Sequence, residues 1–319
     1  MKPAQGHVFV AGSANLDFVA RAPHVPAPGE TVLGRGLELH PGGKGANQAL
    51  ACARAGGAST HMLVALGDDA FGATLESSLR DADVQLHIVR AAGTATGTAF
   101  ICVSDEAENA ITVAPGANDT LAPHHLPPLG AATHLLLQLE TPLESVEAYA
   151  RAARDAGVRV VLNAAPARRL PASLLSRVDL LVVNEGELAM LAGTDDIAQG
   201  LERAGVNDVV VTLGARGCIA RSGDATHLQP AFRVKAVDTT AAGDTFCGAL
   251  VARLSAGDAL DVALRYACAA SALACTRAGA QSSVPTRDEV VALLAATKEH
   301  LAADRDALAA HCGVAAASY

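Results

Sequence analysis

The stretch Val237-Asp238-Thr239-Thr240-Ala241-Ala242-Gly243-Asp244-Thr245-Phe246 places a carboxylate, Asp244, among small residues at the predicted start of a helix. The first amides of a helix lack intrahelical partners and carry a partial positive charge, so they favour an anion. An acid beside such amides is suited to take a proton from a hydroxyl while an incoming phosphoryl group is stabilised. The alternative is an ordinary helix cap, because Asp is common at that position.

A second glycine-rich element, PGGKGANQ, occupies residues 41–48. It is not a Walker A loop, because Gly45 follows the lysine where Ser or Thr should bind magnesium. Residues 12–15, Gly-Ser-Ala-Asn, also lack the second glycine of a dinucleotide-binding turn. Lys44 and Asn47 could instead donate to sugar hydroxyls or to phosphate. The alternative is a solvent-facing lysine in a flexible turn.

Asn15 and Asp17 directly follow the first predicted strand. Side chains two residues apart in an extended segment point to the same side. There they could grip a vicinal diol, with Asp17 accepting two hydroxyl protons. An Asx-turn after the strand is the alternative interpretation.

Short apolar runs alternate with segments of helical spacing along the chain. This alternation predicts an α/β fold with a mostly parallel sheet and helices on both faces. Ligands of such sheets bind beyond the carboxyl ends of the strands. The predicted strands are residues 8–12, 61–66, 134–139, 158–162, 180–183 and 209–213, and the predicted helices are residues 46–55, 71–82, 142–156 and 185–191.

Two segments, residues 16–40 and 96–114, break this alternation. Both are typical of antiparallel strands that project from the main sheet as a small lid. A lid suits phosphoryl transfer, because water would otherwise compete with the acceptor hydroxyl. Two surface hairpins without function are the alternative.

Composition excludes several classes of partner. The 319 residues carry a formal net charge of −9, which argues against nucleic acid, since no basic face is available for phosphates. The seven cysteines show no zinc or redox spacing and predict reduced thiols in a cytoplasm. We expect no signal peptide and no membrane span. Residues 1–298 should form one domain, and residues 299–319 a C-terminal extension to which we assign no role.

Taken together, the motifs closely resemble the phosphofructokinase-B-like (ribokinase) family of sugar kinases. The resemblance covers nearly the whole chain, from about residue 8 to residue 287. Its two specific signatures are GGKGANQA at residues 42–49 and DTTAAGDTF at residues 238–246. Further matching stretches are residues 12–17, 28–31, 108–109, 115–118, 138–140, 163–168 and 279–285.

The resemblance implies a three-layer fold with a β-sheet lid, and ATP-dependent phosphorylation of D-ribose at O5. Asp244 would be the catalytic base, and the amides of Ala241, Ala242 and Gly243 the anion hole. The implied ribose site comprises Asn15, Leu16, Asp17, Gly43, Lys44, Gly45, Ala46, Asn47, Glu140 and Asp244. The implied ATP site comprises Asn184, Glu187, Thr212, Leu213, Gly214, Ala215, Arg216, Gly217, Gly243 and Cys268.

The resemblance also implies metal ions and an assembly. Asn184 and Glu187 match an NxxE element that helps to organise Mg²⁺ and phosphate. A monovalent K⁺ site is implied beside the anion hole, and in this family the lids of two subunits pair, so we expect a homodimer. The matching K⁺ positions are Asp238, Thr240, Ala274, Arg277, Gly279 and Ser283. Cys268 departs from the polar or aromatic residue often found against adenine.

Other functions stay open at this point. A related kinase could act on another pentose, a deoxyribose or a nucleoside, although the lid offers only Phe18 and Phe100 for stacking on a base, and Glu140 suits a free sugar. A catalytically inactive sugar sensor on the same fold is a further alternative. The retained Asp244 and the intact anion hole argue against it.

Overall fold

The computed structural model describes residues 6–106, 108–297 and 302–315, and it confirms the predicted α/β class. The main sheet has nine strands in the order β13-β12-β11-β10-β9-β8-β1-β4-β5. Pairing is parallel from β5 to β11 and antiparallel beyond it. Its strands are β1 (His7–Ala11), β4 (Ser59–Gly67), β5 (Gln85–Ala91), β8 (His134–Leu137), β9 (Arg159–Asn163), β10 (Leu180–Asn184), β11 (Asp208–Thr212), β12 (Gly217–Ser222) and β13 (Ala225–Pro230).

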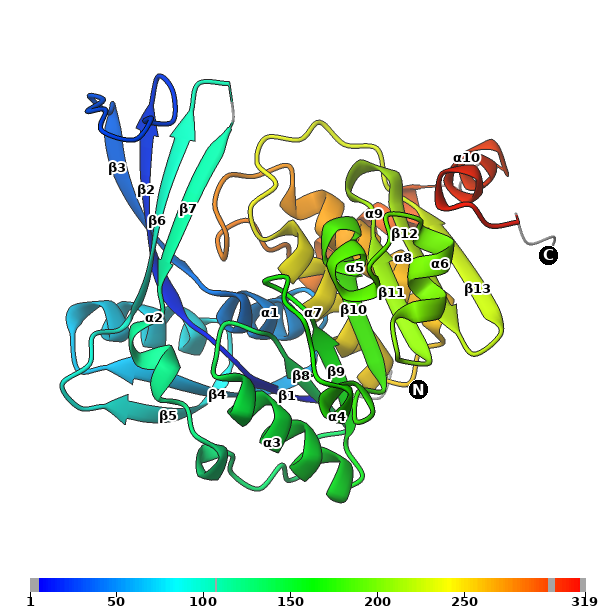
Figure 1. Ribbon diagram of the computed structural model, residues 1–319, viewed down its shortest axis with the longest axis horizontal. Helices are drawn as coiled ribbons and strands as arrows, with labels where there is room; N and C mark the ends of the chain where they lie inside the picture. The colour runs from blue at the N-terminus through cyan, green and yellow to red at the C-terminus, as the bar shows by residue number, and fades with distance from the viewer. Residues whose placement is uncertain (1–5, 107, 298–301, 316–319) are drawn as a thin grey trace.

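Two helical layers cover the sheet (Figure 1). The helices are α1 (Lys44–Arg54), α2 (Ala70–Asp81), α3 (Leu143–Asp155), α4 (Ala172–Leu175), α5 (Glu185–Ala192), α6 (Ile197–Arg203), α7 (Ala242–Ser255), α8 (Leu260–Ala274), α9 (Arg287–Ala296) and α10 (Ala302–Cys312), with short 3-10 turns at Gly116–Thr120, Pro123–His125 and Gly214–Arg216. Within the described residues, none of these helices has both the length and the apolar character that a membrane span requires.

Alternate residues of each central strand enter two separate cores. Val8 and Val10 of β1 pack with residues of α1, α2, α7, α8 and α9. Phe9 and Ala11 of the same strand pack with residues of α3, α4, α5, α6 and α10. The predicted three-layer arrangement is therefore confirmed, and the predicted central strands and helices are present with small differences at their ends.

The sequence prediction missed three strands, β5, β12 and β13. They lie at the two ends of the sheet, where one edge or face is less buried. Their sequences, QLHIVRA, GCIARS and ATHLQP, mix polar with apolar residues. The long apolar run that marks a central parallel strand is therefore absent from them.

The lid is a separate sheet in the order β3-β2-β6-β7. It consists of β2 (Asn15–Ala22), β3 (Gly36–Gly42), β6 (Gly97–Ser104) and β7 (Asn109–Ala114). As predicted, each of the two projecting segments forms an antiparallel pair, and Figure 1 shows both extending away from the main sheet. The two pairs are joined by β2 and β6, which run parallel.

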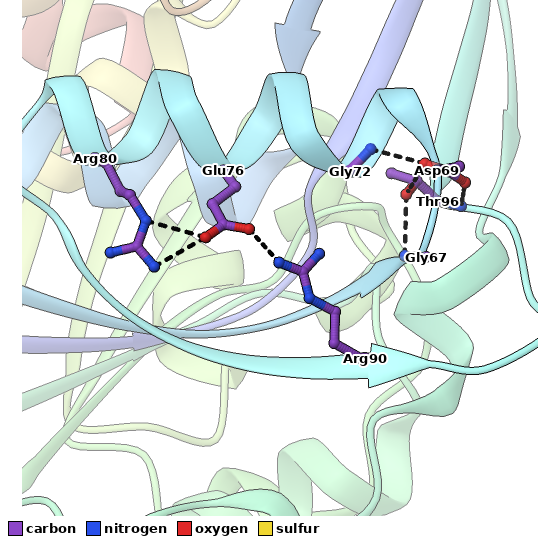
Figure 2. Close-up of polar contacts among 7 residues, drawn as sticks. All are labelled: Gly67, Asp69, Gly72, Glu76, Arg80, Arg90 and Thr96. Carbon is purple, nitrogen blue, oxygen red and sulfur yellow. Dashed lines mark hydrogen bonds and ion pairs between the residues drawn. The ribbon is translucent and has the colours of Figure 1, made fainter.

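The root of the lid is fixed at the start of α2 (Figure 2). The Asp69 carboxylate caps α2 by accepting from Gly72 N at 2.8 Å, and it also accepts from the backbone N and the hydroxyl of Thr96 at 2.8 and 2.7 Å. The Thr96 hydroxyl in turn accepts from Gly67 N at 3.0 Å. Because Thr96 immediately precedes β6, one helix cap ties the lid to the end of β4. The separate Glu76 contacts with Arg80 and Arg90 in Figure 2 lie on the exposed side of α2.

The C-terminal segment is a docked helix where it is described. Leu308, Ala309 and Cys312 of α10 are buried, and α10 packs against β13. His311 also contacts Glu185 at 2.9 Å, at the start of α5. The proposed division into residues 1–298 and 299–319 stays a prediction, and residues 298–301 and 316–319 lie outside the described ranges.

Candidate active site

Asp244 lies in the first turn of α7, as the sequence predicts, and its side chain is 9% exposed. Ala241, which precedes the helix, has a left-handed backbone with φ of 55°, which non-glycine residues adopt rarely. The Ala242 amide donates to Thr239 O at 3.2 Å. Among the described residues, the amides of Ala241 and Gly243 have no protein acceptor. Two of the three predicted anion-hole amides are therefore free to bind an anion.

Both oxygens of the Asp244 carboxylate accept hydrogen bonds from α1. Asn47 Nδ2 donates to Oδ2 at 2.9 Å, and Gln48 Nε2 donates to Oδ1 at 2.8 Å. Helix α1 packs closely on α7, which brings these two consecutive residues to the acid. The sequence prediction included Asn47 but assigned no role to Gln48.

The glycines of the second signature are required by close packing against residues 12–17. Gly43 has φ of 88°, and a Cβ on it would lie 2.7 Å from Ala14 Cα and Asn15 N. A Cβ on Gly42 would lie 2.1 Å from Asp17 Oδ2, and one on Gly45 would lie 2.5 Å from Ser13 N. Larger residues would thus push the loop away from the segment that carries Asn15 and Asp17.

Glu140 links this loop to the end of β8. Its Oε2 atom accepts from Ser13 Oγ at 2.6 Å and from Lys44 N at 3.0 Å. Asn15 Oδ1 accepts from Asn118 Nδ2 at 2.8 Å, a partner to which the sequence prediction gave no role. The side chains of two predicted substrate residues, Leu16 and Ala46, are buried away from these polar groups.

Asp17 is a buried carboxylate at the edge of a cavity of about 590 Å³ beneath the lid. Burial, with the nearby carboxylates of Glu140 and Asp244, raises the pKa of Asp17 to about 7. Three acids thus surround the space where a polar ligand would bind. Hydroxyl groups of a ligand could donate to them in place of water.

Lys44 lines a smaller cavity of about 150 Å³ together with Asn184, Glu187, Gly243 and Asp244. Burial acts to lower the pKa of Lys44, but the carboxylates of Asp244, Glu140 and Glu187 outweigh it and raise that pKa. Lys44 is therefore a half-buried cation between the acid and the N-terminus of α5. That position suits the stabilisation of a phosphoryl group during its transfer.

The NxxE element forms a capping box at the start of α5. Asn184 Oδ1 accepts from Glu187 N at 2.8 Å, and Glu187 Oε2 accepts from Asn184 N at 2.8 Å. Burial raises the pKa of Glu187, although the Asn184 amide and Lys44 act in the opposite direction. The helix cap thus fixes Glu187 at the wall of the small cavity.

A third cavity of about 690 Å³ adjoins the start of α7 on its other side. Predicted ATP-site residues line it, whereas Leu213 is buried and Arg216 pairs with Glu185 at 2.8 Å. The lining residues that the sequence prediction named are Asn184, Thr212, Gly214, Ala215, Gly217, Gly243 and Cys268. It missed Phe232, Val234, Phe246 and Cys275, which also line the cavity. Their apolar side chains suit a flat aromatic base, but the sequence gives no signal that they line this cavity.

The loop that carries the implied K⁺ residues is tied to a second loop through Asp238. Its carboxylate accepts from Thr240 N and Gly279 N, both at 2.9 Å. Burial opposes these two bonds, yet the pKa of Asp238 is lowered. In the described part of the chain, no group of three or more His, Cys, Asp or Glu side chains could hold a metal ion. A site here would depend mainly on backbone carbonyls.

The sequence profile of pfkB family carbohydrate kinases matches residues 5–287 of this chain. The chain belongs to the pfkB family of carbohydrate kinases. Among curated relatives, ribokinase from Haemophilus influenzae is 39% identical over 298 residues, which cover 89% of this chain and 97% of that protein. Deoxyribokinase from Salmonella typhi is 33% identical over 296 residues, covering 88% and 96%.

A solved structure gives the same relationship in three dimensions. The structure of Arabidopsis thaliana ribokinase complexed with ribose and ATP matches this pfkB kinase with a TM-score of 0.82 and 31% identity, covering 91% of this chain and 99% of that one. In this pfkB kinase, the cavity beneath the lid and the apolar cavity share Thr239, and the apolar and small cavities share Gly243. All three are therefore lined in part by residues 239–243, at and just before the start of α7, and Asp244 lines the small one.

Proposed function

We propose that this pfkB kinase transfers the γ-phosphoryl group of ATP to O5 of D-ribose. The observation that carries the proposal is the position of Asp244, which lines the small cavity between the other two and whose carboxylate is held by Asn47 and Gln48. The sugar would bind beneath the lid, and the nucleotide base would bind in the apolar cavity. The ribokinase relatives support ribose and ATP as the reactants.

The reaction needs little covalent chemistry from the protein. Asp244 would accept the proton of the sugar's primary hydroxyl as that oxygen bonds to the γ-phosphorus, while the bond from phosphorus to the ADP oxygen breaks. The free amides of Ala241 and Gly243 and the ammonium of Lys44 would stabilise the charge on the transferred group. Asp17 and Glu140 would orient the sugar, and the lid would exclude water.

Mg²⁺ fits the small cavity as an ion that keeps several of its waters. Glu187 and Asn184 would hold those waters, since Glu187 uses only Oε2 in the capping box. The ion would neutralise charge on the ATP phosphates when bound. A site with so few carboxylates is typical of Mg²⁺ bound mainly through substrate phosphates and water.

A monovalent cation fits the paired loops around Asp238. The carboxylate and the backbone carbonyls of Thr240, Arg277 and Gly279 are hard oxygen donors, and the Asp238–Gly279 bond keeps the two loops adjacent. Ala274 and Ser283 complete the implied set. K⁺, which gives up its hydration easily, suits such a shell, and it would fix the loop that carries Ala241.

We expect K⁺ to raise kcat several-fold over Na⁺ at constant ionic strength, because a fixed loop pre-organises the anion-hole amides. Asp238→Ala should abolish the difference between the two ions. A thermal shift of the wild-type protein in K⁺ against Na⁺ measures binding without relying on turnover. Equal rates and equal melting temperatures in the two salts would contradict the site.

The lid favours a free sugar over a nucleoside. Phe18 stacks on Phe100 at 5.2 Å between ring centroids, and both lie on the face opposite Asp17 by strand alternation. Of the described residues that line the cavity beneath the lid, none is Phe, Tyr or Trp. The expected stacking residues for a base thus point away from the sugar site.

ADP release with ATP, Mg²⁺ and a panel of acceptors tests the proposed function. D-ribose should give a kcat/KM about 5–150-fold above that of 2-deoxy-D-ribose, because a missing hydroxyl leaves a buried partner unpaired at about 1–3 kcal/mol. A preference for 2-deoxy-D-ribose would assign the activity of the deoxyribokinase relatives instead. A preference for adenosine would indicate a nucleoside kinase, and binding without turnover would indicate a sugar sensor.

The assembly and location are also part of the proposal. The outer face of the lid exposes Leu37, Leu39 and Phe100 at 60%, 51% and 53%. Covering these apolar side chains supports pairing of two lids in a homodimer. The free cysteines support a reducing cytoplasm.

A further inference from the structure

Three side-chain amides form a buried network behind Asp244. Besides Asp244, Gln48 contacts Asn163, whose Oδ1 accepts from Gln48 Nε2 at 2.9 Å, and Gln138, whose Nε2 donates to Gln48 Oε1 at 2.7 Å. All three amides are at least nine-tenths buried. They come from α1, from the loop after β8 and from the end of β9, so the network spans the carboxyl ends of two central strands.

The direction of this network is set by a backbone carbonyl. Asn163 Nδ2 donates to Val182 O at 3.1 Å, and a carbonyl can only accept. The Asn163 oxygen must therefore face Gln48, which turns the Gln48 nitrogen, with its second hydrogen, toward Asp244 Oδ1. Gln138 fixes the other end by donating to the Gln48 oxygen.

Two features show that Gln138 is held in this orientation at a cost. Its Oε1 atom is buried and has no hydrogen-bond partner among the described residues. A Cβ on Gly12 would lie 2.0 Å from that same oxygen, so only glycine leaves room for it. Reversing the Gln138 amide would place two oxygens face to face at Gln48, which explains why the orphaned acceptor is retained.

We propose that Gln48 is a positioning residue for Asp244, and that Gln138 and Asn163 determine which end of the Gln48 amide faces the carboxylate. The donor would keep the Asp244 carboxylate in one rotamer, in place to accept a proton. Gln48 need not touch either substrate. The inference rests on the proposed role of Asp244 as the base.

Gln48→Met is the main test, because methionine has a similar shape and no donor. We expect kcat to fall about 10–100-fold, with KM for ribose and for ATP within about threefold of wild type. The kcat–pH profile should also change shape, whereas a loss of folded protein alone would lower kcat equally at every pH. Gln138→Met should have the same effects to a smaller degree.

Gln229→Met is the matched control. Gln229 is also a buried glutamine, but it donates to Pro230 O on β13 and does not contact Asp244. It should leave kcat and the pH profile unchanged. If Gln48→Met does not fold, Gln48→Glu keeps the shape and places a second acid against Asp244, so kcat and its pH profile should change further.

A folded Gln48→Met enzyme with wild-type kcat and pH profile would overturn the proposal. So would a loss that appears only in KM, or one that Gln229→Met reproduces. These outcomes differ from failure of the proposed function, in which the wild-type protein itself would not phosphorylate ribose.

Discussion

Asp244→Asn is expected to lower kcat with ribose by about 10²–10⁴-fold, the usual range for loss of a positioned base. KM for both substrates should change little, because the amides of Ala241 and Gly243 and the side chains of Lys44 and Asp17 remain. Initial rates over a range of both substrate concentrations separate these effects.

The contacts of Asp244 require a stability control for this variant. Asparagine carries one NH₂ group, which must face a donor from either Asn47 or Gln48. We therefore expect a loss of about 1–3 kcal/mol in the free energy of unfolding. Urea unfolding and ATP binding by calorimetry establish that the variant is folded at the assay temperature. A folded variant with near-normal turnover would exclude Asp244 as the base.

The central fold could be predicted from the sequence because its strands are continuous apolar runs. Residues such as 134–137, HLLL, are buried on both faces and need no tertiary information to be recognised. The outer strands β5, β12 and β13 could not, since polar residues interrupt their apolar runs. Whether α10 packs against the main sheet also depends on which face of β13 is left uncovered. The sequence of the C-terminal segment alone does not reveal that face.

The site could be predicted where motif and chemistry coincide in one short segment. Asp244 and Asn47 lie in the two glycine-rich signatures, and Asp17 follows a recognisable strand. The partners of Asp244 could not be paired from the sequence. Gln48 and Asp244 are 196 positions apart, and Gln138 and Gln48 are 90 positions apart. The residues were within recognised motifs, but only the packing of α1 on α7 shows what they hold.

In the same way, strand register decides which face of the lid each side chain occupies. The sequence places Phe18 one position from Asp17, and only alternation in a paired strand shows that the two side chains leave opposite faces. The same register puts the buried Asp17 near the half-buried Glu140 and the buried Asp244.

Asp17→Asn is expected to lower kcat/KM for ribose by about 10–10³-fold, because its NH₂ group cannot accept from a hydroxyl and a charged acceptor is lost at about 1.5–3 kcal/mol for each bond. The activity of the wild-type enzyme should also decline below about pH 7, where Asp17 of the free enzyme becomes protonated. Glu38→Gln, which changes an exposed acid of the same cavity, should leave kcat/KM near the wild-type value.

The same variant should be more stable than the wild-type protein at high pH. The pKa of Asp17 is about 7 in the folded protein, against an ordinary value of 3.8. Between these values the unfolded chain has released the proton and the folded chain has not, so this group lowers the free energy of unfolding as pH rises from about 4 to 7, and the cost is complete above 7. A three-unit shift corresponds to at most about 4 kcal/mol, and relaxation reduces it to about 1–3 kcal/mol.

Urea unfolding of both proteins at pH 5 and pH 8 measures the difference. Asp17→Asn should raise the free energy of unfolding more at pH 8 than at pH 5. Together with the loss of ribose turnover, that result would show that the buried acid serves sugar binding and destabilises the fold. An equal free energy of unfolding for the two proteins at both pH values would instead show that Asp17 is ionised throughout.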